Sequence, residues 1–386
     1  MTDKYVIGMG FGDEGKGVVT DYLCSQDNTK LVIRFSGGQQ AGHTVYSNKV
    51  KHVFSNFGSG SFRGNPTVWL NTCTVDPLGI INEYTELLHK GVKPRLFIHR
   101  DCPVTTPFEK RVNRILNDLN GHGSVGVGVG QTWQREEDHY HLTFEDLFYP
   151  RVLRDKLWNI KNYYLKKYPN FSLNWYDEID KFQKQIQELI HYMSYPKTIE
   201  MYGISSSVLT ETDGGNIYEG SQGLLLDPKI GFFPHVTRSN LFDHIFTNKH
   251  SKDIYLVTRA YLTRHGAGPM CCDGFEHKIK VNLDETNIDN YQGNFRTNYL
   301  NVDLLQYALE KSKINDLNFN PKTNIYLVIT CLDQIIDKWS FIYKDTLKTF
   351  DSEEEFVENI VKILNINRNF VLLNNSPYSE TIRKFV

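Results

Sequence analysis

The stretch GMGFGDEGKG at residues 8–17 combines glycines, one lysine and two acids. Glycines can turn backbone N–H groups toward an anion, a following helix N-terminus adds partial positive charge, and Lys16 can neutralise phosphate oxygens. A standard phosphate loop reads G-x-x-x-x-G-K-[ST], whereas here Gly17 follows the lysine, and Asp13 and Glu14 lie inside the loop. A carboxylate is useful there if Mg²⁺ bridges it to phosphate, or if it removes a substrate proton.

Two later segments offer further reactive groups. FSGGQQAGHTVY (35–46) places His43 after a paired-glycine turn, where an imidazole can contact a phosphoryl group in transfer. YEGSQGLLLDPKIGFFPHVTRSN (218–240) contains Gln222, whose amide offers both a donor and an acceptor to a base edge. Taken alone, the second segment is equally well explained as a structural loop.

The elements around these segments predict an α/β fold. KYVIGMG (4–10) and KLVIRFSGG (30–38) are apolar runs that stop at glycines, as buried strands do, and GKGVVTDYLCS after the first has helical spacing. Further strand-like runs are TVWLNT, PRLFIHR, NIYEGSQG, DIYLVTRAYLTR and NIYLVITCLD. Several are followed by helical patterns, such as DPLGIINEYTELLHKG (76–91). This alternation predicts a mostly parallel central sheet flanked by helices.

Two other regions are predicted to be helical. Residues 151–200 carry apolar positions at three and four spacing, which predicts a helical insertion in a single domain of residues 1–386. SEEEFVENIVKILNIN (352–367) predicts a capped amphipathic helix, followed by a strand at NFVLLN.

Composition limits the classes of partner. The 386 residues are 40% hydrophobic and 23% charged, which is a globular composition, and the net charge of -2 gives no general attraction to nucleic acid or anionic membrane. No apolar run approaches the roughly 20 residues that span a bilayer. The start lacks a secretory pattern, and the six cysteines form no CxxC pair. We therefore expect a cytoplasmic protein without a disulfide framework or zinc site.

Six ordered motifs resemble those of adenylosuccinate synthetases: GDEGKG, GGQQAGHT, EGSQGLLLD, FPHVTRSN, TRHGAGP (263–269) and TCLDQI (330–335). That family's pattern reads G-D-E-G-K-G-K, G-G-x-N-A-G-H-T, E-G-A-Q-G-x-x-L-D, Y-P-x-V-T-S-S-N, T-R-V-G-x-G-P and T-K-L-D. The tail SPYSET (376–381) is similar to the family's closing G-P-x-R-x-E-T. The resemblance runs from residue 4 to about residue 383 and implies a fold like that of P-loop nucleotide hydrolases.

The resemblance implies a ligase that joins L-aspartate to C6 of a purine nucleotide, converting IMP to adenylosuccinate with hydrolysis of a nucleoside triphosphate. The purine 6-oxygen is first phosphorylated, because it is otherwise a poor leaving group. By resemblance, Asp13 takes the N1 proton, His43 stabilises the transferring phosphoryl group, Lys16 holds the triphosphate and Gln222 positions the 6-oxygen.

The resemblance also assigns binding residues. Those expected to contact the triphosphate are Gly12, Glu14, Gly15, Gly17, Gly42, Thr44, Asp333 and Ser376. Those expected to contact substrate are Gln40, Ser124, Val125, Thr237, Arg264 and Arg296. Asp13 and the Gly42 carbonyl would ligate Mg²⁺. The family also implies a homodimer in which the partner supplies an arginine; Arg135 and Arg151 lie in the right region, but neither aligns with it.

Several motifs depart from the family pattern. GSVGVGVG (123–130) keeps Ser124 but has Val125 in place of a phosphate-binding threonine, a lost hydroxyl worth roughly 1 kcal/mol. The amino-acid loop YQGNFRTNY (291–299) keeps one arginine, Arg296, which can hold a carboxylate bidentately. Cys331 replaces the lysine that packs on the base, next to the base-reading Asp333. Gln40 replaces an asparagine, and Phe11 a tryptophan.

These departures leave the acceptor, the donor and the amino acid open. The phage aminodeoxyadenylosuccinate synthetases of this superfamily, which add aspartate to deoxyguanylate and in some cases use ATP or dATP, have similarly relaxed motifs. Asp13 fits the IMP reaction at least as well, because some phage members replace that acid. A nucleotide-binding protein without ligase activity is a third interpretation. Retention of Asp13, His43, Lys16 and Gln222 together favours catalysis.

Overall fold

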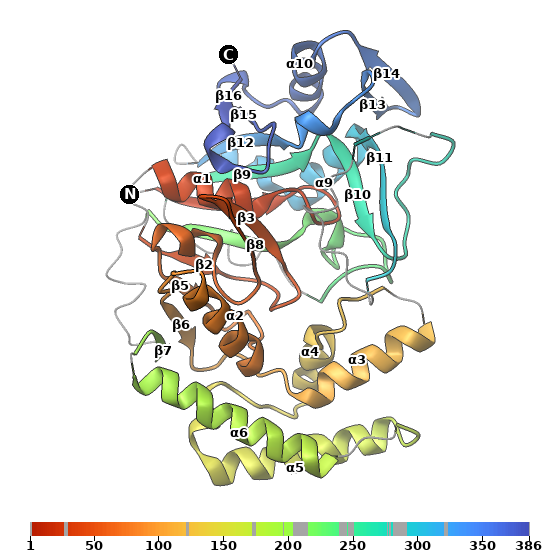
Figure 1. The fold of residues 1–386 in the computed structure, drawn as a ribbon. Coiled ribbons are helices and arrows are strands. Elements are labelled where there is room, and N and C mark those ends of the chain that lie inside the picture. Colours follow the sequence, from red (N-terminus) through yellow and green to blue (C-terminus); the bar gives the residue numbers. More distant parts are fainter. Residues whose placement is uncertain are drawn as a thin grey trace.

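A ten-stranded sheet runs through the middle of the molecule in the order β16-β15-β12-β9-β1-β8-β2-β5-β6-β7 (Figure 1). The computed structural model describes residues 2–26, 30–120, 123–171, 175–195, 197–203, 215–238, 245, 251–275, 277, 279–280, 292–319 and 323–385. Neighbouring strands of this sheet are parallel, except that β16 runs antiparallel to β15. The predicted mostly parallel α/β sheet is confirmed.

The strands of this sheet coincide with the apolar runs of the sequence. They are β1 Asp3–Gly8, β2 Val32–Arg34, β5 Thr67–Trp69, β6 Leu96–His99, β7 Ile199–Tyr202, β8 Ile217–Gly223, β9 Lys252–Arg259, β12 Thr323–Thr330, β15 Val371–Leu373 and β16 Arg383–Lys384. All seven residues of β8 are buried, as expected for a central parallel strand covered on both faces. Tyr5 of β1 stacks on Tyr218 of β8 with ring centroids 4.4 Å apart, which fixes the register of the two central strands.

Helices cover the sheet and extend beyond its β7 edge (Figure 1). The α-helices are α1 Lys16–Gln26, α2 Pro77–His89, α3 Pro107–Asn120, α4 Val129–Glu137, α5 Pro150–Lys167, α6 Trp175–Ser194, α9 Val302–Ser312 and α10 Glu353–Leu364. The 3-10 helices are η1 Ser59–Arg63, η2 Glu145–Phe148, η3 Leu224–Leu226, η5 Ile314–Phe319, η6 Leu332–Gln334, η7 Arg368–Phe370 and η8 Ser379–Thr381. None of the described helices is long and apolar enough to cross a membrane.

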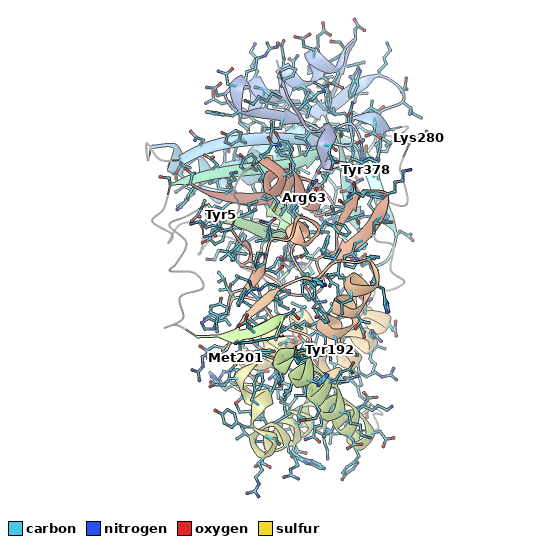
Figure 2. The ribbon with its side chains drawn as sticks, turned by 60° about the vertical axis from the view of Figure 1, so that its left-hand side comes forward. Tyr5, Arg63, Tyr192, Met201, Lys280 and Tyr378 are labelled. Atoms are coloured by element: carbon cyan, nitrogen blue, oxygen red, sulfur yellow. The ribbon has the colours of Figure 1, made fainter. Side chains whose placement is uncertain are left out.

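The two regions predicted to be helical are found as helices. α10 begins where the Ser352 hydroxyl accepts a hydrogen bond from the Glu355 N–H at 3.1 Å, and it ends at Asn365 in the left-handed conformation. α5 and α6 occupy most of 151–200, but Ile199 and Glu200 belong to edge strand β7 of the main sheet. Figure 2 shows Tyr192 of α6 and Met201 of β7 toward the same end of the molecule. The extent of a single domain stays a prediction.

Two smaller sheets were not predicted. β3 His43–Ser47 and β4 Val50–Phe54 form a hairpin whose turn residues Asn48 and Lys49 both have positive φ, as a type I′ turn requires. β10 Tyr261–His265, β11 Phe295–Asn301, β13 Trp339–Tyr343 and β14 Thr346–Phe350 form a four-stranded sheet. The run DIYLVTRAYLTR, predicted as one strand, is therefore two: the chain leaves the main sheet after Arg259 and enters the second sheet as β10.

Candidate active site

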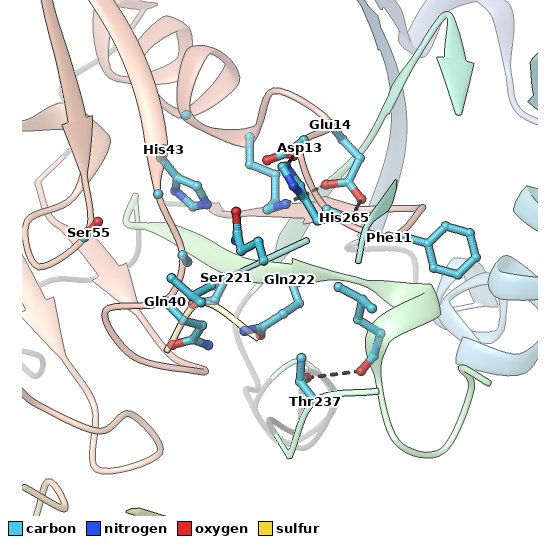
Figure 3. Close-up of a pocket in the computed structure, with 18 of the residues that line it drawn as sticks. Phe11, Asp13, Glu14, Gln40, His43, Ser55, Ser221, Gln222, Thr237 and His265 are labelled. Atoms are coloured by element: carbon cyan, nitrogen blue, oxygen red, sulfur yellow. Dashed lines mark hydrogen bonds and ion pairs between the residues drawn. The ribbon is translucent and has the colours of Figure 1, made fainter. Parts of the chain in front are cut away.

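A cavity of about 540 Å³ opens at the carboxyl ends of the central strands, which is where α/β sheets bind ligands (Figure 3). The loop after β1, the loop after β2, the end of β8 and the segment 123–130 all contribute to its wall. All of the site residues expected from the sequence line it, with two exceptions, Asp333 and Arg296. Residues that are far apart in the sequence thus line one cavity.

Glu14, the second acid of the glycine-rich loop, stabilises the loop through hydrogen bonds to its backbone. Its Oε1 accepts hydrogen bonds from the N–H groups of Gly10 at 3.1 Å and Gly12 at 2.8 Å, and its Oε2 lies 2.6 Å from Lys16 Nζ. A side chain on Gly8 would collide with the Glu14 carboxylate, so the glycine makes room for it. Lys16 is thereby held at the cavity with its charge balanced internally.

Asp13, the first acid, has positive φ (59°) and faces the cavity rather than the loop interior (Figure 3). Its Oδ2 lies 2.7 Å from His265 Nε2, and its backbone carbonyl accepts a hydrogen bond from Arg259 Nε. Burial alone would raise the pKa of the Asp13 carboxyl, but His265, Arg259 and Lys16 outweigh burial and lower that pKa below its usual value. Asp13 is therefore an ionised carboxylate, ready to accept a proton or bind a cation.

His43 at the start of β3 is oriented by a buried glutamate. Its Nδ1 lies 2.7 Å from Glu219 Oε1, and the Ser59 hydroxyl donates to the same oxygen. Burial raises the pKa of Glu219, yet His43, Arg34 and Ser59 together lower it to about 2. Because an ionised carboxylate only accepts hydrogen bonds, Nδ1 carries a proton. Burial lowers the pKa of the His43 imidazole, although Glu219 opposes this.

The other ring nitrogen of His43, Nε2, belongs to a residue of the cavity wall. Nε2 is buried and has no hydrogen-bond partner among the described residues. A neutral imidazole fixed in this way presents an acceptor at Nε2, and a protonated one presents a donor. Glu219 was not predicted from the sequence, although a signal is present: it is the acid of EGSQG, three residues before Gln222.

Gln222 is a buried amide without a protein partner. Its side chain is 4% exposed, and neither its Oε1 nor its Nε2 makes a hydrogen bond within the described part of the chain. Gln40 Oε1 is likewise buried and unpaired there. Burying an amide unpaired costs about 1–3 kcal/mol, so these groups indicate a ligand that supplies both a donor and an acceptor.

One wall of the cavity is suited to a phosphate group. It contains Thr237, whose hydroxyl donates to the Leu226 carbonyl at 3.1 Å, and Ser124, whose hydroxyl accepts from Asn113 Nδ2 at 2.8 Å. Arg238, which was not predicted from the sequence, also lines this wall. Within the described part of the chain, its guanidinium pairs with the solvent-exposed Glu137 at 2.5 Å, and exposed pairs of this kind are weak. An anion in the cavity can therefore compete for Arg238.

Two arginines lie opposite each other on the β10–β11 hairpin. Arg264 and Arg296 are register partners, and both donate to backbone carbonyls, Arg264 to those of Ala267, Pro269 and His235 and Arg296 to that of Gly268. Burial and the charge of Arg296 lower the pKa of Arg264 to about 10. Arg264 lines the cavity, whereas Arg296 is not part of its wall. Two cations this close favour a carboxylate ligand.

The family model for adenylosuccinate synthetase matches residues 5–335. The chain belongs to the adenylosuccinate synthetase family. The adenylosuccinate synthetase of Histophilus somni (strain 2336) is 32% identical over 286 residues, 70% of this chain and 65% of that protein, so the match spans slightly less than two thirds of that relative. The Picrophilus torridus enzyme is 28% identical over 361 residues, 90% of this chain and 81% of that protein.

Two solved structures share the fold. Fully ligated adenylosuccinate synthetase from Plasmodium falciparum superposes with a TM-score of 0.72 at 17% identity over 99% of both chains. Cyanophage S-2L succinoaminodeoxyadenylate synthetase (PurZ), bound to dGMP and dATP as an energy donor, superposes with a TM-score of 0.61 at 13% identity, covering 100% of this chain and 95% of that one. The α/β fold of the family is thereby shown.

The segment TCLDQI (330–335) lies only partly in the cavity wall. Cys331 and Ser376 line the cavity, but the Asp333 side chain is exposed and outside its wall. Cys331 has positive φ (58°), and the short helix η6 that follows it turns Asp333 away. Three residues of the compared motifs, Ser239, Asn240 and Tyr291, lie outside the described residues.

Neither arginine considered for a partner subunit's site is placed there by the structure. Arg135 is fully buried, with its Nε 2.8 Å from Glu109 Oε1, so it cannot reach a neighbouring chain. Arg151 is exposed at the start of α5.

Proposed function

We propose that this chain joins L-aspartate to C6 of a purine nucleotide, IMP in the first instance, with hydrolysis of a nucleoside triphosphate. The observation that carries the proposal is the buried amide of Gln222, which has no hydrogen-bond partner among the described residues. It lies in a cavity that also presents the Asp13 carboxylate and the Nε2 of His43. A 6-oxopurine offers an oxygen acceptor and an N1–H donor on one edge, which matches an amide and a carboxylate.

The reaction follows from these groups in two stages. Asp13 accepts the N1 proton, and the electron density released makes O6 nucleophilic toward the γ-phosphorus of the triphosphate. His43 Nε2 stabilises the phosphoryl group as it passes from the diphosphate to O6. The amine of aspartate then attacks C6, and the bond from C6 to the phosphorylated oxygen breaks, releasing phosphate. The attacking nitrogen loses one proton, which the departing phosphate or water accepts. Positioning and charge neutralisation supply most of the rate in phosphoryl transfer.

The donor chemistry of the site fits Mg²⁺ bound through phosphates. No group of three or more His, Cys, Asp or Glu side chains able to hold a metal occurs within the described ranges. Mg²⁺ commonly uses one or two carboxylates plus substrate phosphates, and the ionised Asp13 with the Gly42 carbonyl, both in the cavity wall, supplies such a set. When bound, the ion would neutralise charge on the β- and γ-phosphates.

Binding roles follow the walls of the cavity. Lys16 and the 12–17 backbone hold the triphosphate, while Thr237, Ser124 and Arg238 receive the 5'-phosphate of the acceptor nucleotide. Arg264 receives a carboxylate of the amino acid, and Arg296, its register partner outside the cavity wall, adds positive charge beside it. A cytoplasmic homodimer completes the proposal, and sedimentation of the purified protein tests the dimer.

The test is a matrix of purified protein with IMP, dIMP, GMP and dGMP against GTP, ATP and dATP, with and without L-aspartate and with Mg²⁺ present. We expect aspartate-dependent phosphate release and a change in purine absorbance with IMP. Turnover with dGMP alone would assign the chain to deoxyguanylate chemistry instead. Asp13→Ala and His43→Ala should abolish turnover, and persistence of full turnover in either variant would refute the mechanism. No release in any combination would favour a non-catalytic nucleotide-binding protein.

A further inference from the structure

Strand β10 contacts the glycine-rich loop residue by residue. The Thr263 hydroxyl donates to the Gly12 carbonyl at 3.0 Å, and the Arg264 guanidinium lies 4.1 Å from the centre of the Phe11 ring. Next along the strand, His265 Nε2 lies 2.7 Å from Asp13 Oδ2. Three successive side chains of β10 thus contact three successive residues of the loop, Phe11 to Asp13.

His265 is itself firmly held. Its backbone pairs with Phe295 of β11, and its ring lies against the Phe295 ring with centroids 4.9 Å apart. The following N–H, that of Gly266, donates to the Asn294 carbonyl at 3.1 Å. The His265 side chain is 14% exposed, and it lines the cavity beside Asp13 (Figure 3). A ring restrained on one side by a strand pair can restrain the carboxylate on its other side.

Asp13 needs such restraint. A non-glycine residue with φ of 59° pays a conformational penalty of about 1–2 kcal/mol, so its neighbours must hold it there. Arg259 and Thr263 fix the backbone of Gly12 and Asp13, but they leave the Asp13 side chain free to rotate. Among the described basic side chains, His265 is the one that forms an ion pair with the Asp13 carboxylate.

We propose that His265 is a positioning residue for Asp13: its Nε2 holds the carboxylate in the orientation needed to meet the purine N1 proton. The proposal rests on the function proposed above. It also joins two parts of the site, because the strand that carries His265 carries Arg264, and the paired strand carries Arg296. The antiparallel strand pair β10–β11, which receives the amino acid, therefore also orients Asp13, the general base.

Steady-state kinetics of His265→Leu and His265→Gln test this role. We expect His265→Leu to lower kcat about 10–100-fold, the usual effect of removing the partner that orients a reactive group, with each KM within about threefold of wild type. His265→Gln keeps an N–H donor and should recover most of the loss. His141→Leu is the matched control, because it breaks a histidine–carboxylate contact of 2.6 Å, with Glu136, outside the cavity. An unchanged kcat in folded His265→Leu, or a change in KM alone, overturns the proposal, as does equal loss in His265→Gln.

Two further readouts separate this proposal from the function it rests on. A nucleoside triphosphate labelled with heavy oxygen between its β- and γ-phosphorus reports the phosphoryl-transfer stage alone when aspartate is left out. Reversible transfer moves the label into non-bridging positions, and the rate of this exchange should fall with kcat in His265→Leu. NMR of the histidine ring nitrogens needs no turnover: the signal lost in His265→Gln should shift in Asp13→Asn. Absence of that shift overturns the pairing, even in an active enzyme. Absence of wild-type turnover with the shift present refutes the proposed function and leaves the pairing standing.

Discussion

Gly17 leaves no room for a side chain beside His43: a Cβ added to Gly17 would lie 2.9 Å from the His43 Cβ and 3.3 Å from the His43 carbonyl carbon. The added Cβ would also lie 3.2 Å from the Thr44 carbonyl oxygen. The first turn of α1 therefore packs directly on the first residue of β3. This is why the loop ends in glycine where a standard phosphate loop has serine or threonine. The space for a hydroxyl is taken by the strand that delivers His43.

Gly17→Ser, which restores the standard phosphate-loop residue, should therefore impair the protein. Overpacking of this kind costs about 1–3 kcal/mol, and the displaced backbone is that of His43. We expect a lower melting temperature and reduced nucleotide-dependent phosphate release. Gly203→Ser is the control, because the atoms near its Cβ belong to the flexible Arg100 side chain and it lies outside the cavity. Full activity in Gly17→Ser would show that the close packing is unimportant.

The parallel sheet, α1, α10 and the loop residues Asp13, Lys16 and His43 were predictable because their signals are local: an apolar run, a cap or a motif. The division of DIYLVTRAYLTR into β9 and β10 was not, since both halves have strand periodicity and only tertiary pairing separates them. The role of Glu219 depends on its contact with His43, 176 residues away in the chain. The role of His265 depends on its contact with Asp13, which lies about 250 residues away. The position of Asp333 outside the cavity wall was not predictable either, because a motif gives sequence position and not the backbone conformation, such as the positive φ of Cys331. The role of Asp333 in reading the base stays a prediction.

Glu219→Gln should reduce both activity and the pH dependence of stability. The pKa of Glu219 is lowered from 4.5 to about 2 in the folded protein, so its ionised form stabilises the fold above about pH 4.5, and this contribution disappears as pH falls toward 2. We expect the wild type to be more stable than Glu219→Gln near neutral pH and the difference to shrink through that window. Loss of the group that orients His43 should lower phosphate release about 10–100-fold.

Thermal denaturation from pH 7 to pH 2 measures the effect of Glu219. Glu358→Gln is the control, because Glu358 is an exposed carboxylate paired with Arg368 on the surface. A constant difference between wild type and Glu219→Gln across the window would contradict the linkage.

Gln222→Met should stabilise the free protein while it destroys function. The amide of Gln222 is buried without a hydrogen-bond partner among the described residues, and replacing it with an apolar side chain of similar size removes a penalty of about 1–3 kcal/mol. The melting temperature should rise, and turnover should fall because the purine edge loses its partner. Gln306→Met on α9 is the control, since Gln306 already donates to Glu310 at 3.1 Å. A lower melting temperature in Gln222→Met would mean that the amide is satisfied within the protein.

Arg296→Leu should chiefly raise the KM for the amino acid. Charge-assisted contacts of a guanidinium with a carboxylate are worth about 1.5–3 kcal/mol, which corresponds to roughly 10- to 150-fold in apparent affinity. Arg296 is not part of the cavity wall, so its guanidinium must act together with Arg264, whose pKa it lowers. Removing one of two neighbouring cations also relieves repulsion, and we therefore expect no loss of thermal stability. Titration of aspartate at saturating nucleotide measures the change, and an unaltered KM for the triphosphate is the internal control. If aspartate dependence stays as in wild type, Arg264 alone holds the carboxylate, and the hairpin has replaced a two-arginine clamp by a single one.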